Sequence, residues 1–168
     1  KADLSGANLA KNGSAVANLT NADLTGAILT DAILSEANLT GANLTKANLT
    51  GANLTSTILT GANLTGADLT GATLANVVIS ATTNLTSAIL VGADLGGDDL
   101  TGVDLEKADL RGADLALTDL ENAILTGANL GKNGTTATDL TGATLTGAKL
   151  GKADLSGANL AKNGSAVA

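Results

Sequence analysis

The sequence predicts an all-β solenoid, a chain wound into stacked coils, from three observations. Leucine recurs every five residues between Leu4 and Leu160, and 29 of the 30 leucines share this register once one inserted residue between Ile79 and Leu85 is allowed for. Alanine stands two residues before the central position in 23 of 33 units. Thr or Ser commonly follows the central leucine, and Gly often comes next. A five-residue repeat sustained over a whole chain is typical of repeat architectures.

The period of five excludes both a helix and a flat strand. At about 100° per residue, successive leucines would lie about 140° apart around a helix, so no apolar stripe would form. In a strand, side chains alternate with a period of two, so an odd spacing would turn every second leucine to the opposite face. The remaining solution is a short extended segment followed by a turn that resets the phase.

The run 41–45, Gly-Ala-Asn-Leu-Thr, shows how each unit is expected to lie. Ala42 and Leu44 point to one side and Asn43 to the other. The Thr-Gly pair that follows the leucine turns the corner, because glycine tolerates a positive φ. Every unit turns the same way, so the coils stack and bury their leucines against each other. We expect a narrow interior filled with leucine.

The motif A(D/N)LXX, seen throughout the chain, resembles that of the pentapeptide-repeat family. The resemblance implies a right-handed quadrilateral β-helix with four units per coil, hence about eight coils of four pentapeptides in a single domain spanning residues 1–168. The chain begins inside a repeat, so we expect it to be a fragment of a longer chain.

The repeat has a few irregular units. Three of them lack a leucine at the centre and contain the string Lys-Asn-Gly-Ser or Lys-Asn-Gly-Thr, which predicts outward loops, with a ligand-contacting loop as the alternative. Their central residues are Ser14, Thr135 and Ser165. The inserted residue within 80–84 predicts a bulge. Isoleucine replaces the outward Asn or Asp at positions 28, 33, 58, 89 and 124, which predicts scattered exposed apolar side chains.

The chain is acidic, with 9 basic and 16 acidic residues and a net charge of −7. Such a chain is repelled by phosphate backbones, so we expect no direct nucleic-acid binding. Residues 94–121 hold nine acidic and two basic residues, whereas the rest of the chain is neutral. We call these nine the acidic belt: Asp94, Asp98, Asp99, Asp104, Glu106, Asp109, Asp114, Asp119 and Glu121.

Four units per coil would place Asp94 beside Asp114 and Asp99 beside Asp119, at the spacing of neighbouring strands. We interpret the acidic belt first as a solvated surface that discourages aggregation. The alternatives are an interaction surface for a basic protein partner and a calcium-type oxygen site, although no EF-hand-like loop is present.

Composition excludes much of active-site chemistry. The chain has no Cys, His, Phe, Tyr, Trp, Met or Pro, so it has no disulfide, no Cys/His metal or haem site and no histidine-based catalysis. Paired carboxylates can cleave glycosides, but no aromatic platform accompanies them. We therefore expect no enzyme, no catalytic residue, no cofactor and no metal. The longest uncharged stretch, 69–93, is interrupted by polar residues, so we expect no membrane span in this segment.

These observations favour a non-enzymatic structural and protein-interaction module, a rigid rod-like scaffold domain of a larger protein. The resemblance implies cyanobacteria-like members that are domains of larger, sometimes membrane-associated proteins, which leaves cytoplasm and membrane attachment both open. Other family members mimic B-DNA and inhibit or protect DNA gyrase. This chain lacks their dimerising C-terminal module, so a DNA-mimic role is the alternative.

A third function follows from the threonines. Between residues 20 and 70 the position after the leucine is Thr in ten of eleven units, which would suit an ice-binding array. Because this array wraps all sides of the rod, we instead expect that these threonines are present for their strand preference and bond locally to the backbone.

The two ends of the chain have the same sequence. Residues 1–17 and 152–168 both read KADLSGANLAKNGSAVA. Either the protein belongs to an array with a super-repeat of 151 residues, or the sequence was constructed. Open solenoid edges invite stacking, so we expect end-to-end self-association or flanking segments at the ends.

Overall fold

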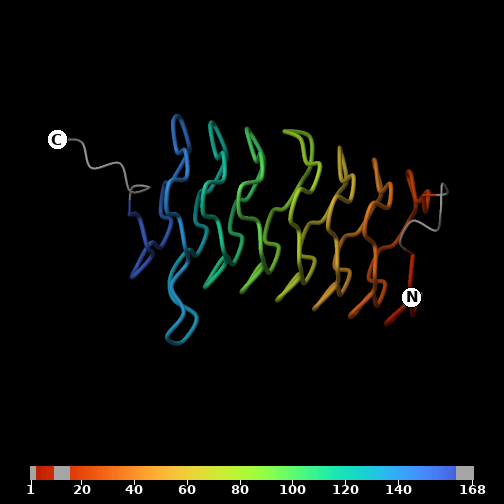
Figure 1. Cartoon of the computed structure of the whole chain (residues 1–168). Helices are drawn as coiled ribbons and strands as arrows, with labels where there is room; N and C mark the ends of the chain where they lie inside the picture. The colour runs from red at the N-terminus through yellow and green to blue at the C-terminus, as the bar shows by residue number, and fades with distance from the viewer. Residues whose placement is uncertain (1–2, 10–15, 162–168) are drawn as a thin grey trace.

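The computed structural model describes residues 3–9 and 16–161, and the solenoid prediction is confirmed. Coils stack along one axis, and the first and last described segments lie at opposite ends of the rod (Figure 1). Within these residues there is no helix and no strand of several residues, because the β-structure consists of single-residue parallel bridges. Most bridges join residues 20 apart, such as Asn43 and Asn63, so a coil closes after four units. The described residues therefore offer no helix with the length and apolarity to cross a bilayer.

A unit of the central coils with Asn or Asp before its leucine can bond all five of its backbone amides, as residues 62–66 illustrate. The Ala62 amide closes the preceding turn on the Leu59 carbonyl at 2.9 Å. The Asn63 amide donates to Ala42 of the preceding coil at 2.9 Å, and the Leu64 amide donates to Asn84 of the following coil at 2.8 Å. The Gly66 amide donates to Thr86 of that same following coil at 3.0 Å. Four of the five amides are thus bonded to backbone carbonyls.

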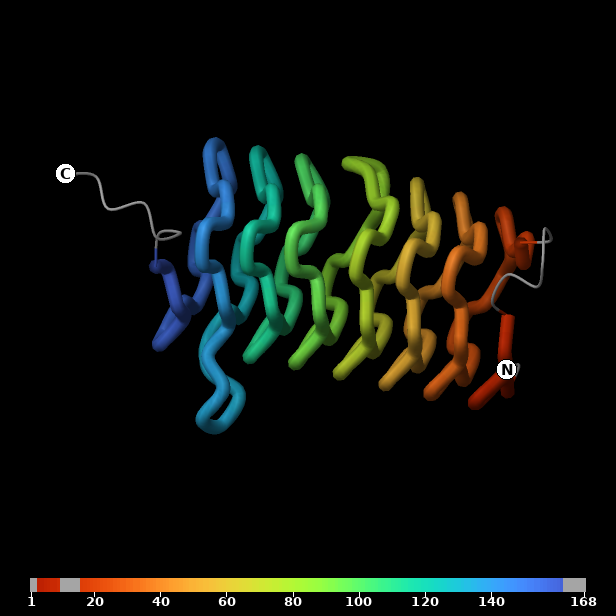
Figure 2. Tube along the Cα trace, in the orientation of Figure 1, coloured from red at the N-terminus to blue at the C-terminus, as the bar shows by residue number. Residues whose placement is uncertain are grey.

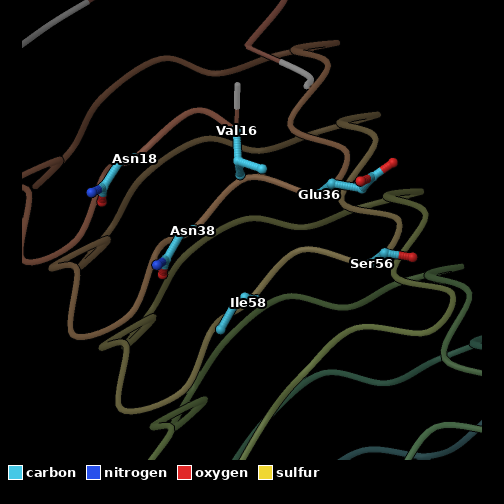
Figure 3. Close-up of a pocket in the computed structure, with 6 residues that line it drawn as sticks. All are labelled: Val16, Asn18, Glu36, Asn38, Ser56 and Ile58. Atoms are coloured by element: carbon cyan, nitrogen blue, oxygen red, sulfur yellow. The ribbon is translucent and has the colours of Figure 1, made fainter. Parts of the chain in front are cut away.

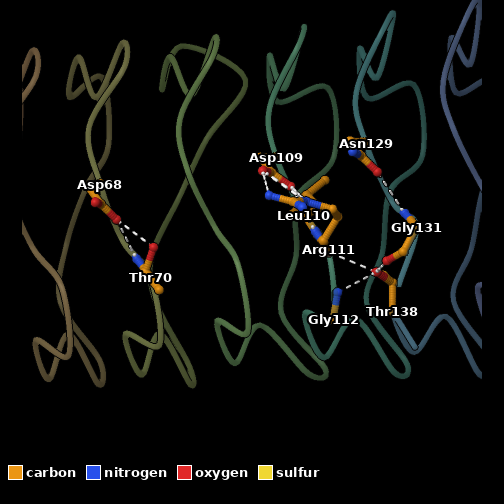
Figure 4. Close-up of polar contacts among 9 residues, drawn as sticks. All are labelled: Asp68, Thr70, Asp109, Leu110, Arg111, Gly112, Asn129, Gly131 and Thr138. Atoms are coloured by element: carbon orange, nitrogen blue, oxygen red, sulfur yellow. Dashed lines mark hydrogen bonds and ion pairs between the residues drawn. The ribbon is translucent and has the colours of Figure 1, made fainter. Parts of the chain in front are cut away.

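The fifth amide, that of the residue after the leucine, is bonded by a side chain. Asn63 Oδ1 accepts from the Thr65 amide at 3.1 Å and from the Thr65 hydroxyl at 2.6 Å. Asp68 does the same for Thr70, at 3.0 and 2.6 Å (Figure 4). Asn and Asp both carry the required oxygen. This contact explains why the position before the leucine is so often one of these two residues.

The interior consists of the alanine and leucine positions. Ala42 and Leu44 are both fully buried, as are their equivalents through the central coils. Burying a leucine contributes roughly 1.5–3 kcal/mol. The prediction that Ala and Leu point inward and Asn outward is therefore confirmed, and leucine fills the interior.

The corners of the coils require a positive φ two residues after the leucine. Gly51 has φ +67, and a Cβ there would also collide with the Asp31 side chain of the preceding coil. Lys46 holds φ +56 at an equivalent corner despite its side chain. The one leucine outside the register, Leu117, lies at such a corner with φ +62. Its side chain is 57% exposed, because a corner side chain points away from the interior.

The loop predicted around Thr135 is confirmed. Asp114 pairs with Asp139, 25 residues away, whereas most bridges join residues 20 apart. One five-residue unit is therefore looped out and does not form part of the coil wall. Asn133 and Thr136 instead pair antiparallel, through amide–carbonyl bonds of 2.8 and 3.0 Å. The loop extends beyond the outline of the neighbouring coils (Figure 2). The predicted loops at Ser14 and Ser165 lie outside the described residues.

The bulge predicted near residue 80 is also confirmed. Asn63 pairs with Asn84, 21 residues away, so this coil has one extra residue. The Thr83 amide donates to the Ser80 carbonyl at 2.8 Å, which closes the widened corner. The isoleucines at the Asn position are outward and exposed or half-buried: Ile28, Ile33, Ile58, Ile89 and Ile124.

We predict that Asn63→Ala lowers the free energy of unfolding by about 0.5–1.5 kcal/mol, because the Thr65 amide and hydroxyl lose their shared acceptor. Urea denaturation followed by circular dichroism measures the change. Asn63→Asp is the matched control, since it keeps the oxygen and its neighbours on the same face, Asn43 and Asn84, are neutral. Equal destabilisation by both variants would contradict this assignment.

Candidate interaction surface

The acidic belt encircles the rod. Asp94, Asp99, Asp104 and Asp109 hold the outward Asn position of four successive units, and successive units lie on different faces. Asp114 and Asp119 repeat the first two of these faces one coil later. Glu106 and Glu121 follow their leucines at the corners. The charge is therefore distributed around the rod and is not gathered in a cleft.

Two carboxylates of the acidic belt are neutralised by adjacent bases. Arg111 donates to both oxygens of Asp109, with Nη2 at 2.6 Å from Oδ2 and Nε at 2.8 Å from Oδ1 (Figure 4). These hydrogen bonds lower the pKa of Asp109. Lys107 Nζ lies 2.7 Å from Glu106 Oε1 in a more exposed pair. Both bases of the 94–121 segment are thus engaged.

The other aspartates of the acidic belt form no ion pair with a described residue, and four of them form two parallel columns, whereas Asp104 pairs with the uncharged Asn84 and Ile124. Asp94 pairs with Asp114 and Asp99 with Asp119, as expected from the repeat. None of the four forms an ion pair with a described residue. Their Oδ1 atoms accept the backbone amides two residues on, at 2.9 to 3.2 Å. We call these four residues the aspartate grid; it covers two adjacent faces.

Asp98 does not belong to this surface, which corrects the sequence prediction. Its side chain is only 5% exposed, and its Oδ2 has no hydrogen-bond partner. Burial raises the pKa of Asp98 to about 7, and repulsion from Asp94 adds to the effect, against backbone hydrogen bonds from Asn76 and Val77. The repeat pattern already indicated that Asp98 is buried, because Asp98 stands two residues before Leu100, at the inward alanine position.

Other polar residues at this inward position show what a buried group needs there. Thr57 donates its hydroxyl to the Leu34 carbonyl at 2.8 Å, and Thr118 donates to Leu95 at 2.9 Å. Thr138 accepts the Gly112 amide at 2.9 Å and lies 2.8 Å from the Leu110 carbonyl (Figure 4). A hydroxyl has a proton to donate to a carbonyl, whereas an ionised carboxylate has none. Asp98 therefore fits this interior best when it is protonated.

A shallow groove lies on the N-terminal half of the rod, far along the chain from the aspartate grid (Figure 3). Its volume is about 510 Å³. The residues lining it are Val16, Asn18, Glu36, Asn38, Ser56 and Ile58. Asn18, Asn38 and Ile58 are stacked on one face, and Glu36 supplies the one carboxylate. This lining has no pair of carboxylates for acid–base chemistry.

Many of the threonines after the leucines have their hydroxyl hydrogen-bonded within their own unit. The hydroxyls of Thr45, Thr50 and Thr65 donate to the Asn side chain two residues earlier at 2.6 to 2.7 Å. The partner is this side chain and not the backbone. Because successive units turn to different faces, these threonines surround the rod and form no single flat array.

No group of acidic side chains within residues 3–9 and 16–161 converges as three or more ligands for a metal ion. Among these residues, the acidic belt therefore has no ligand set for the calcium-type site that was the alternative interpretation. The carboxylates of the aspartate grid instead accept backbone amides within their own units.

Comparison with known proteins agrees with the architecture. A family model described as pentapeptide repeats matches residues 17–55, 42–82, 81–115, 99–132 and 138–163. A search of curated proteins found no match.

Among solved structures, Rfr23, a pentapeptide repeat protein from the cyanobacterium Cyanothece 51142, is 25% identical over 76% of this chain and 88% of its own, with a TM-score of 0.53. HetL, a pentapeptide repeat protein involved in heterocyst differentiation regulation in the cyanobacterium Nostoc sp. strain PCC 7120, is 34% identical over 92% of this chain and 83% of its own, with a TM-score of 0.49. Trypsin-treated QnrB1, a plasmid-mediated fluoroquinolone resistance protein, is 20% identical over 96% of this chain and 79% of its own, with a TM-score of 0.50. The chain shares the right-handed quadrilateral β-helix of such structures.

We predict that Asp98→Thr stabilises the protein at pH 8 by up to about 4 kcal/mol and has little effect near pH 4. The pKa of Asp98 rises from 3.8 in the unfolded chain to about 7 in the folded one. Its contribution is therefore most favourable below pH 4, falls as the pH rises towards 7, and stays constant above that.

Urea denaturation of both proteins between pH 4 and pH 8 measures this difference. Asp99→Asn is the control, because hydrogen bonds from Thr101 lower the pKa of Asp99 and its contribution has the opposite sign. A difference between Asp98→Thr and the parent that does not change with pH would refute the prediction.

Proposed function

The chain belongs to the pentapeptide-repeat family, and on that premise we propose that it is a non-enzymatic structural and protein-interaction module. In this role it is a rigid, rod-like scaffold domain of a larger protein. The observation that carries the proposal is the closed hydrogen bonding of the five-residue unit, in which each amide of residues 62–66 has an acceptor. A rod held together in this way needs an acceptor oxygen at the outward position, which Asn and Asp both provide, and it does not need a particular charge there.

The outward positions are therefore available for recognition. Asn and Asp bond the following amide equally well, as Asn63 and Asp68 do. Charge can be placed on the rod at such positions without altering the fold. The aspartate grid is the place where unneutralised charge is concentrated, and a basic protein surface is the complementary partner.

We expect replacement of the aspartate grid by asparagine to weaken binding of a basic partner by about tenfold at low salt, since exposed ion pairs contribute about 0.2–1 kcal/mol each. The four changes are Asp94→Asn, Asp99→Asn, Asp114→Asn and Asp119→Asn. Fluorescence anisotropy with a labelled ten-residue oligolysine peptide measures the affinity, and raising the salt concentration should remove the difference.

The matched control changes four aspartates of the same type outside the acidic belt and alters the net charge equally. These four also stand directly before a leucine, and each accepts the backbone amide two residues later. They are Asp3, Asp23, Asp68 and Asp154. If both variants lose the same affinity, net charge alone attracts the peptide and the aspartate grid is not a specific surface.

The second candidate is a DNA-mimic inhibitor or protector of DNA gyrase. The two columns of aspartates on adjacent faces favour it, since they repeat charge along the rod axis. Against it, double-stranded DNA carries a charge about every 1.7 Å along its whole axis, whereas the excess here is confined to residues 94–121. We therefore rank this function second.

We predict that gyrase supercoils plasmid DNA at an unchanged rate when this protein is added at low micromolar concentration. A gel assay of supercoiling tests this, with the asparagine variant of the aspartate grid alongside the parent. Inhibition by the parent that the variant lacks would instead favour mimicry of DNA.

A further inference from the structure

The C-terminal end of the described rod is an open edge. Leu125 and Leu130 donate their amides to Lys149 and Asp154 of the last coil, at 2.9 and 2.7 Å. The amides of Leu150 and Leu155, one coil later, have no acceptor among the described residues. Leu160 is 56% exposed, whereas the leucines of the central coils are fully buried. This edge presents both apolar surface and unpaired backbone groups.

The N-terminal end is only partly covered. Residues 3–9 lie on the coil that contains Ile28 and Ile33, through the bonds Leu4 to Ile28 at 2.8 Å and Leu9 to Ile33 at 2.7 Å. The other two units at this end of the rod contain Asn18 and Asp23. The amides of these two residues have no acceptor among the described residues. Among the described residues, half of this edge is therefore uncovered.

The segment at the C-terminal edge is the same as the one that covers the N-terminal coil. Residues 154–160 repeat residues 3–9 side chain for side chain. The bridges also place the two segments on the same faces of the rod, since one series of bridges connects Asp3 with Asp154 and a second connects Asn8 with Asn159. The first runs Asp3, Ile28, Asn48, Asp68, Ile89, Asp109, Asn129, Asp154, and the second runs Asn8, Ile33, Asn53, Thr73, Asp94, Asp114, Asp139, Asn159. Sequence and rotational phase thus coincide at the two ends.

We propose that the rod joins end to end with a second copy of this chain by segment exchange. Residues 154–160 of one copy take the place of residues 3–9 on the coil of Ile28 and Ile33 of the other copy. The exchanged segment has the same side chains, so every contact made by the displaced residues is reproduced. Exchange of an identical element between copies is a low-cost route to association.

The joint adds contacts that neither copy has alone. Following the faces around the coil, Asn18 of the second copy lies on Thr144 of the first, and Asp23 lies on Lys149. Asp23 and Lys149 are then an opposite-charge pair on neighbouring coils, which stabilises the junction. The amides of Asn18 and Asp23 and the leucines of the last coil gain partners, so the open edges favour the joined form.

Sedimentation velocity over a range of protein concentrations tests the proposal. We expect the parent to form elongated oligomers as the concentration rises, and Leu160→Asp to shift this association to at least about tenfold higher concentration. Leu117→Asp is the matched control, because Leu117 is equally exposed but lies on a corner in the middle of the rod. A parent that stays monomeric, or equal effects of the two variants, would overturn the proposal.

Deletion of residues 1–9 separates segment exchange from simple stacking of two complete ends. If segments are exchanged, the deletion frees the place on the coil of Ile28 and Ile33 that residues 154–160 of the other copy must take. Association then becomes stronger. In simple stacking, the deletion removes part of the contact and association becomes weaker, which would overturn the exchange. Circular dichroism checks that the shortened chain keeps its β-structure.

Charge reversal tests the register of the joint. Lys149→Asp places two aspartates opposite each other and should weaken association about two- to fivefold at low salt. Adding Asp23→Asn to the same chain keeps the acceptor oxygen for Thr25 and should restore most of the loss. Unchanged association in Lys149→Asp would contradict the proposed register.

Discussion

The solenoid depends on finding an acceptor for the one amide in each unit that the backbone cannot bond. Turns and neighbouring coils supply carbonyls for four amides of residues 62–66, but the Thr65 amide is bonded by the Asn63 side chain. An amide left without a partner in a tight corner would cost free energy comparable to a lost hydrogen bond. Because most units carry this acceptor oxygen as Asn or Asp, the same unit can be repeated along the rod without a separate globular core.

This requirement fixes the presence of an oxygen and leaves the charge free. Asn63 and Asp68 perform the same structural task, so the exchange of one for the other changes the surface potential with little effect on the fold. The aspartate grid is the result of such exchanges on two adjacent faces. Recognition by this protein can therefore vary independently of the architecture, which is the property expected of a scaffold.

The interior is less tolerant than the surface. At the inward position two residues before the leucine, Thr57 and Thr118 succeed because each donates its hydroxyl to a leucine carbonyl of the preceding coil. Asp98 has the same place but leaves Oδ2 without a partner, and its raised pKa reflects the cost of burying a charge there. At the corners the limit is the positive φ, which Gly51 adopts freely and Lys46 adopts despite its Cβ, and a Cβ at Gly51 would also require the Asp31 side chain to move.

The period of five by itself determined the solenoid and the inward direction of residues such as Ala42 and Leu44. These follow from local geometry, because the number of residues between turns sets where each side chain points. Only the tertiary structure decided that Arg111 neutralises Asp109, that Asn133 and Thr136 pair antiparallel within the loop, and that Asp98 is buried without a partner for its Oδ2. The first two are local contacts that depend on side-chain and turn geometry, and the third depends on the neighbouring coil, where Asn76 and Val77 contact Asp98. The repeat pattern encodes neither kind of detail.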